Sequence, residues 1–119
     1  AAAVADPGSP EVAAGLVRAA GDADLAVRMA AARALGALDP LPDEAVGVLV
    51  KMTRGDARAE ARMAAVRGLA AAGPRAKAAR PELEALAAGG MPGLDLWARV
   101  AVAAVDGDPA AAAEAVRAG

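Results

Sequence analysis

The amino-acid sequence predicts an all-α protein, an alpha-alpha superhelix of about three helical hairpins followed by one terminal helix. The first observation is an internal repeat. Residues 28–35, Arg-Met-Ala-Ala-Ala-Arg-Ala-Leu, return 34 positions later as residues 62–69, Arg-Met-Ala-Ala-Val-Arg-Gly-Leu. The second is that apolar residues recur at helical spacing and no segment alternates as a β-strand does. A repeat of this length favours a solenoid, because one helical unit buries its apolar face only when a neighbour stacks on it.

Each helix is predicted from its start and stop signals. Ser9 followed by Pro10 is typical of an N-cap and a first helical position, while a glycine or proline after an apolar run ends a helix. Either Asp22 or Asp24 is expected to cap the second helix. The first four expected helices are about 10–20, 25–38, 43–53, which is capped by Asp43, and 58–72. A fifth runs from Pro81 to the glycine cluster at 89, a sixth from its cap Asp95 to the loop at 106, and the last covers 110–118. The basic stretch 75–80 is expected to be a connector or a short helical turn.

The composition indicates close packing through small side chains. Hydrophobic residues make up 57% of the 119 residues, but much of that is alanine and the only aromatic residue is Trp97. The expected sixth helix, for instance, has Leu96, Arg99, Val100 and Ala103 on one face at helical spacing. We expect one domain with repeat units of about 10–40, 41–74 and 75–106 and a partial unit, 107–119.

Few residues could carry catalytic chemistry. The chain has no cysteine and no histidine, so it lacks the commonest metal ligands and the commonest general base. Ser9 and Thr53 have the only hydroxyl groups and no histidine to activate them. The pairs Asp22/Asp24 and Asp106/Asp108 are spaced like metal-loop carboxylates, but further ligands are missing and helix capping explains them. We therefore expect no catalytic residue, no cofactor and no metal.

The sequence gives no sign of a membrane protein. Charges, proline or glycine interrupt every apolar run well short of the roughly 20 residues that a spanning helix needs. The first residues lack the basic region and the long apolar stretch of a signal peptide. We expect a cytoplasmic protein.

Two segments resemble HEAT repeats, in particular the short bacterial kind called HEAT-like or phycobilin-lyase-type repeats. The signature is an Asp-containing turn, then Val-Arg, then an alanine-rich helix with leucine near its end. Residues 22–38 and 56–72 match it well, and residues 95–105 form a weaker copy. The resemblance covers about residues 10–118 and implies the superhelical fold.

The resemblance also implies a ladder in which Asp and Arg side chains of successive repeats pair. The planar arginine fork suits a carboxylate, and a carboxylate near a helix N-terminus also accepts hydrogen bonds from free N–H groups. The alternative is that Asp24 and Arg28 form an exposed i,i+4 pair. The residues that match the ladder motif are Asp22, Asp24, Asp56 and Asp95 with Arg28, Arg62 and Arg99.

Charge is concentrated in the middle of the chain. Residues 51–80 carry eight basic and two acidic side chains, while the segments on either side are each acidic. This basic band either lies solvated over alanine-rich surface, meets an acidic protein, or meets phosphate groups. Trp97 either fills the seam between the last hairpins or is a binding anchor. The candidate partner-binding residues are Arg58, Arg75, Lys77, Arg80 and Trp97.

The function expected from these observations is a non-enzymatic scaffold that binds a protein partner, and the basic band favours an acidic one. Nucleic acid is the less favoured partner, because the whole chain has a net charge of −2. A nucleic-acid- or phosphate-binding module through residues 51–80 is one alternative. An accessory repeat segment of a larger bacterial enzyme, or a designed scaffold, is another.

Overall fold

The computed structural model describes residues 10–89 and 91–118 and confirms the all-α superhelix. Within these residues there are seven α-helices, one 3-10 helix and no strand. The elements are α1 (Pro10–Ala19), α2 (Leu25–Gly36), α3 (Asp43–Gly55), α4 (Ala59–Ala72), the 3-10 helix η1 (Gly73–Ala79), α5 (Arg80–Ala88), α6 (Leu94–Val105) and α7 (Pro109–Ala118).

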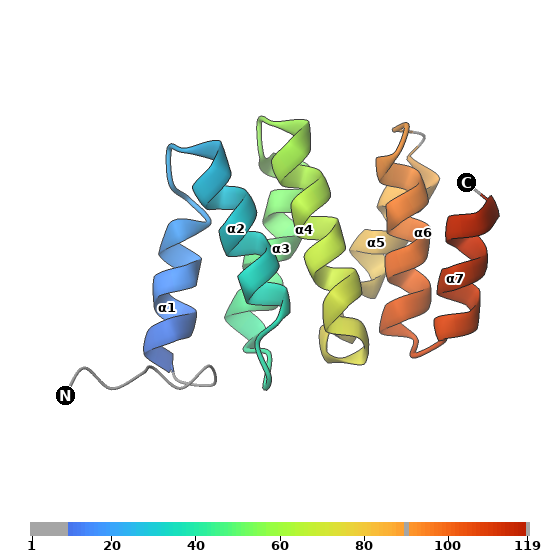
Figure 1. The fold of residues 1–119 in the computed structure, drawn as a ribbon, viewed down its shortest axis with the longest axis horizontal. Coiled ribbons are helices and arrows are strands. Elements are labelled where there is room, and N and C mark those ends of the chain that lie inside the picture. Colours follow the sequence, from blue (N-terminus) through green and yellow to red (C-terminus); the bar gives the residue numbers. More distant parts are fainter. Residues whose placement is uncertain (1–9, 90, 119) are drawn as a thin grey trace.

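The helices form two layers along an elongated body (Figure 1). In one layer α4 packs between α2 and α6, and behind it α3 packs on α4 and α5 packs on α6. At the ends of the stack, α1 contacts α2 and α7 contacts α6. The principal extents are 49 × 29 × 21 Å. Each helix therefore packs on its neighbours, as in a solenoid, and no central element is shared by all.

The helix starts differ from the sequence prediction at two caps. Asp24 does cap α2, since its side chain accepts a hydrogen bond from the Ala26 N–H at 2.8 Å. Asp43, however, is the first helical residue of α3 and Pro42 occupies the cap position. The predicted cap Asp95 is also wrong, because α6 begins after Gly93 and Asp95 lies in its first turn. Both acids still face the positive end of a helix dipole. Ser9, the predicted first cap, lies outside the described residues.

The stretch 75–80, predicted as a connector or a short helical turn, is helical. Residues 73–79 form a 3-10 helix that leads directly into α5, which starts at Arg80, one residue before the predicted Pro81. α2 ends at Gly36, earlier than predicted. The buried face of α6 agrees with the predicted one only in part: Val100 is buried as predicted, together with Leu94, Ala98, Ala101 and Val105, whereas Arg99 is exposed.

The core between the layers is made of a few leucines set among alanines. Leu35, Leu49, Leu69 and Leu83 are fully buried, each on a different helix. Leu35 and Leu69 occupy the same position of the internal repeat. The other fully buried positions are mostly alanine, which adds little apolar area of its own. Burial in this fold therefore depends on how closely the helix backbones approach.

Two glycines set that approach between α2 and α4. A Cβ atom added to Gly36 would lie 2.3 Å from the backbone oxygen of Gly68, and one added to Gly68 would lie 2.7 Å from the backbone oxygen of Ala32. Neither neighbour is the end of a flexible side chain, so the helices would have to move apart. The seam between the first two repeats accepts only glycine at these two positions.

We therefore expect Gly68→Ala to lower the free energy of unfolding by about 1–3 kcal/mol, because the overpacked seam must open. Urea unfolding followed by circular dichroism measures the change. Gly47→Ala is the matched control: Gly47 is also inside a helix, but a Cβ there meets nothing within 4 Å. That variant should be more stable by about 0.5–1 kcal/mol, since alanine favours a helix. Destabilisation by both substitutions would contradict the glycine seam.

Candidate functional site

An ion pair links the first two repeats of the chain. Arg28 Nε on α2 donates to Asp56 Oδ2 at 2.9 Å, and Arg28 Nη2 donates to Asp56 Oδ1 at 3.3 Å. The arginine side chain is 15% exposed and the aspartate side chain 7%. The pair is thus two-pronged and mostly buried, the geometry in which an arginine fork holds a carboxylate best.

The same arginines also bind loop carbonyl groups. Arg28 Nη1 donates to the backbone oxygens of Asp22 at 3.0 Å and Ala23 at 3.1 Å. At the matching repeat position, Arg62 Nη1 donates to the backbone oxygen of Asp56 at 2.6 Å. Each arginine therefore fastens the loop that precedes its own helix, and Asp56 receives one arginine on its carboxylate and the next on its carbonyl group.

Not all of the proposed ladder residues come together. Asp22 accepts a hydrogen bond from the Asp24 N–H within its loop, and Asp95 accepts one from the Leu96 N–H in the first turn of α6, so both bind neighbouring backbone. Across the described residues, no carboxylate pairs with Arg62 or Arg99. The geometry supports one side-chain rung between repeats, Arg28–Asp56, and the larger ladder stays a prediction.

The Arg28–Asp56 pair changes the acidity of the aspartate. Burial raises the pKa of the Asp56 carboxyl, but the Arg28 hydrogen bond, the Arg58 backbone N–H and the charges of Arg28 and Arg62 together lower it further. The net result is a pKa below the ordinary value of an aspartate. The carboxylate is therefore held in its charged form by the fold.

The arginines of the basic band are mostly engaged within the chain. Arg58 pairs with Glu60 at 3.2 Å, and Arg54 pairs with Glu82 at 2.7 Å. Arg80 pairs with Asp106 at 2.7 Å and with Glu84. Arg75 donates to the backbone oxygens of Gly36 and Leu38. Three of the basic candidates for partner contact, Arg58, Arg75 and Arg80, thus have partners within the chain.

Lys77 differs from these arginines. It is exposed and its ammonium group has no hydrogen bond or ion pair among the residues that the structure describes. The Arg80 hydrogen bond is the main cause of the lowered pKa of Asp106, and burial opposes it. The charge of Lys77 lowers that pKa further. One free lysine remains of the four basic candidates.

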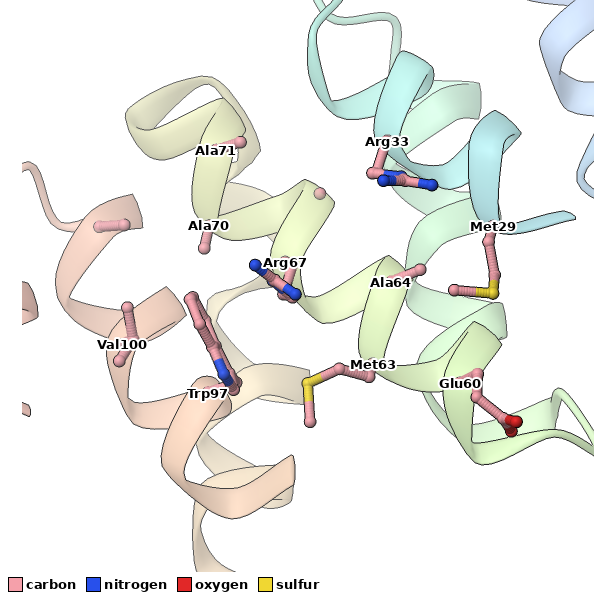
Figure 2. Close-up of a pocket in the computed structure, with 12 residues that line it drawn as sticks. Met29, Arg33, Glu60, Met63, Ala64, Arg67, Ala70, Ala71, Trp97 and Val100 are labelled. Atoms are coloured by element: carbon pink, nitrogen blue, oxygen red, sulfur yellow. The ribbon is translucent and has the colours of Figure 1, made fainter. Parts of the chain in front are cut away.

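A hollow of about 640 Å³ opens on the layer formed by α2, α4 and α6. Figure 2 shows the side chains of Met29, Met63 and Trp97 along it, one from each helix. All three are half-buried. We call these three residues the apolar row. Alanines and Val100 fill most of the remaining wall, so the hollow is predominantly apolar.

Two arginines lie beside the apolar row, as Figure 2 shows: Arg33 on α2 and Arg67 on α4. They occupy equivalent positions of the internal repeat, and both are exposed. The guanidinium carbon of Arg67 lies 4.7 Å from the centre of the Trp97 ring, within the range of a cation–π contact. Trp97 thus contacts Arg67 and lines an open hollow, and its role as a binding anchor stays a prediction.

Met29, Met63, Arg33 and Arg67 are not among the binding residues predicted from the sequence. The internal repeat could have indicated all four, because side chains at equivalent positions of adjacent helices lie in a row. What could not be seen was which repeated positions face the layer surface.

Neither a metal cluster nor a membrane helix is found in the described part of the chain. Among residues 10–89 and 91–118, no group of three or more acidic, histidine or cysteine side chains could hold a metal ion. In the same residues, none of the helices combines the length and apolar character required to cross a bilayer.

Comparison with known families agrees with the fold. The family model described as HEAT repeats matches residues 1–70, more than half of the chain. The chain belongs to the HEAT-repeat family. HEAT repeats are commonly protein-interaction scaffolds and are typically non-enzymatic. The matched range holds the first strong copy of the repeat motif and all but the last two residues of the second, and the weaker copy at 95–105 of this HEAT-repeat protein lies beyond it. No curated protein and no solved structure matches the chain.

The Arg28–Asp56 rung should contribute measurably to the stability of this HEAT-repeat protein. We expect Asp56→Asn to lower the free energy of unfolding by about 1–3 kcal/mol, because Arg28 would lose its charged partner in a mostly buried position. Urea unfolding measures this. The control is Glu82→Gln, which removes the exposed pair with Arg54 and should change stability by less than about 0.5 kcal/mol. Equal effects of the two substitutions would count against an inter-repeat role of the rung.

Stability should also fall in acid. A carboxyl whose pKa is lowered in the folded state stabilises the fold above its unfolded pKa, about 4, and loses that contribution as the pH falls through the folded pKa. The pKa values of Asp56, Glu60 and Asp106 are all lowered. The urea midpoint should therefore drop from neutral pH to about pH 3, and the difference between the wild type and Asp56→Asn should narrow over that range. A constant difference would show that Asp56 does not titrate with folding.

Proposed function

We propose that this chain is a non-enzymatic HEAT-repeat scaffold that binds a protein partner in the hollow on α2, α4 and α6. The observation that supports the proposal most directly is the apolar row. Met29, Met63 and Trp97 project from three neighbouring helices into a hollow of about 640 Å³. Aromatic and methionine side chains at an open, concave surface are characteristic of protein interfaces.

The chemistry of the chain supports a binding role over a catalytic one. It has no histidine and no cysteine. Thr53, the hydroxyl residue within the described range, is 1% exposed and donates its hydrogen bond to the Val50 backbone oxygen at 2.6 Å. A buried hydroxyl that serves its own helix is unavailable as a nucleophile.

The engagement of the basic band argues against the nucleic-acid alternative. Nucleic-acid binding depends on several lysine and arginine side chains that neutralise phosphates together. Here Arg54, Arg58 and Arg80 are already paired with carboxylates, and Arg75 is bound to backbone oxygens. These four of the eight basic side chains of residues 51–80 are therefore engaged within the fold, and a phosphate chain would have to break those contacts to use them.

Selection of binders from a library of short random peptides, displayed on phage, tests the proposal. Selected peptides should bind the wild-type chain and lose about tenfold or more in affinity on Met63→Ser/Trp97→Ser, because the row is the anchor of the site. Trp97 is the only tryptophan of the chain, so its fluorescence should also change when a peptide fills the hollow of the wild type.

Val27→Ser serves as the matched control. Val27 is an exposed apolar residue on α2 that does not line the hollow, and its replacement should leave peptide affinity unchanged. Circular dichroism must show that each variant is folded as the wild type is. Binders that ignore the row substitutions and leave Trp97 fluorescence unaltered would refute the proposed site.

A further inference from the structure

We infer that the hollow is built for an acidic, partly apolar peptide segment of the partner, whose carboxylates pair with Arg33 and Arg67 while its apolar side chains contact the apolar row. This inference rests on the proposed function and adds the chemistry of the partner. Arg33 and Arg67, rather than the predicted candidates Arg58, Arg75, Lys77 and Arg80, then give the surface its preference for acid.

Within the described residues neither of these two arginines has an acidic partner, and both line the hollow. Arg33 is exposed and makes no hydrogen bond or ion pair with any residue that the structure describes. Arg67 is exposed, and its only contact of this kind among those residues is with the Trp97 ring. Glu60, the one acid lining the hollow, is paired with Arg58. The hollow therefore has two positive charges that nothing in the described fold neutralises.

The contact with Trp97 leaves Arg67 able to bind a carboxylate. A guanidinium group that stacks on an aromatic ring uses its face, and its N–H groups point outward in the plane of the group. The ring also limits the positions that the side chain can take, so less freedom is lost when a carboxylate binds. An acidic group that reaches Arg67 would find a donor already held in place.

The repeat places the two arginines at equivalent positions of adjacent helices. Arg33 and Arg67 lie on packed helices, and packed helices have axes about 8–10 Å apart. In a peptide with the polyproline II conformation, carboxylates separated by three positions lie on the same side and about 9 Å apart. A segment that crosses α2 and α4 can therefore place an acid at each arginine, and apolar side chains between them can reach Met29 and Met63.

An acidic peptide fits this surface better than a nucleic acid does. A phosphate chain would meet only two unpaired arginines in the hollow and would lie against the apolar row, whose single hydrogen-bond donor is the indole N–H of Trp97. The single tryptophan gives one stacking position, whereas single-strand binding surfaces use several aromatic rings. The mixture of a charged pair and an apolar floor matches a segment that contains both carboxylates and leucine-like side chains.

Fluorescence anisotropy with designed peptides tests the inference on the full chain. The first probe has two glutamates separated by three positions with leucines between them. The second has lysine in place of each glutamate, the third has serine in place of each leucine, and the fourth is a single-stranded oligonucleotide of similar length. The first should bind at least about tenfold more tightly than each of the others, change the fluorescence of Trp97, and weaken as salt is added.

The variants Arg33→Gln and Arg67→Gln locate the effect. Combined, they should reduce the affinity for the glutamate peptide by about tenfold, with little effect on the lysine peptide. Arg18→Gln removes an exposed arginine of α1 that does not line the hollow and should change nothing. All three arginines are exposed, so the variants are expected to fold, which circular dichroism checks.

The failures of the two proposals are distinguishable. Peptides selected from the random library that need the apolar row but contain no excess of acid would overturn the inference and leave the scaffold function in place. Equal binding of the lysine peptide, or tighter binding of the serine peptide or the oligonucleotide, would overturn it as well. If no library peptide depends on the row, the proposed function fails and the inference fails with it.

Discussion

The close backbone approach of α2 and α4 at Gly36 and Gly68 is the constraint on which the rest of the structure depends. An alanine-rich chain has few large side chains, so it gains burial chiefly by bringing helix backbones together. A Cβ atom at either glycine would collide with the backbone of the other helix. That contact places α2 beside the loop that carries Asp56, and it sets how far apart the repeated side chains of the two helices lie. Both the ion pair and the hollow are consequences of this seam.

The arginines of the repeat serve two purposes. One equivalent pair holds the stack together, and the other pair faces outward. Arg28 and Arg62 turn to the loops and bind backbone oxygens there. Arg33 and Arg67, five positions further along the same helices, are exposed at the hollow. A turn and a half of helix separates the two sets. One short motif thus supplies both the internal fastening of the array and a surface that repeats from helix to helix.

Much of this architecture follows from the sequence, because helix periodicity, breakers and the repeat are local signals. They located every helix of the described chain to within a few residues and led to the family. The predictions failed where three-dimensional context decides. Asp43 and Asp95 have the chemistry of a cap, yet the chain enters those helices one or two residues earlier, through Pro42 and Gly93. The sequence suggests that Arg58, Arg75 and Arg80 are available to a partner. Their internal partners lie on other helices or in the neighbouring turn, which local sequence signals do not show. The hollow could not be foreseen, because it depends on which face of each helix the stacking leaves open.

The hydrogen bonds of Arg75 bear on how the array unfolds. A simple repeat protein behaves as a row of units coupled only to adjacent ones, so its ends can melt while the middle stays folded. Arg75 belongs to η1, at the close of the second hairpin, and it binds the backbone oxygens of Gly36 and Leu38 at the close of the first. Fraying of the last turn of α2 therefore breaks contacts with η1, which itself packs against α3, α4, α5 and α6. This cross-connection adds to the helix packing between the two hairpins and couples the melting of the first to that of the second.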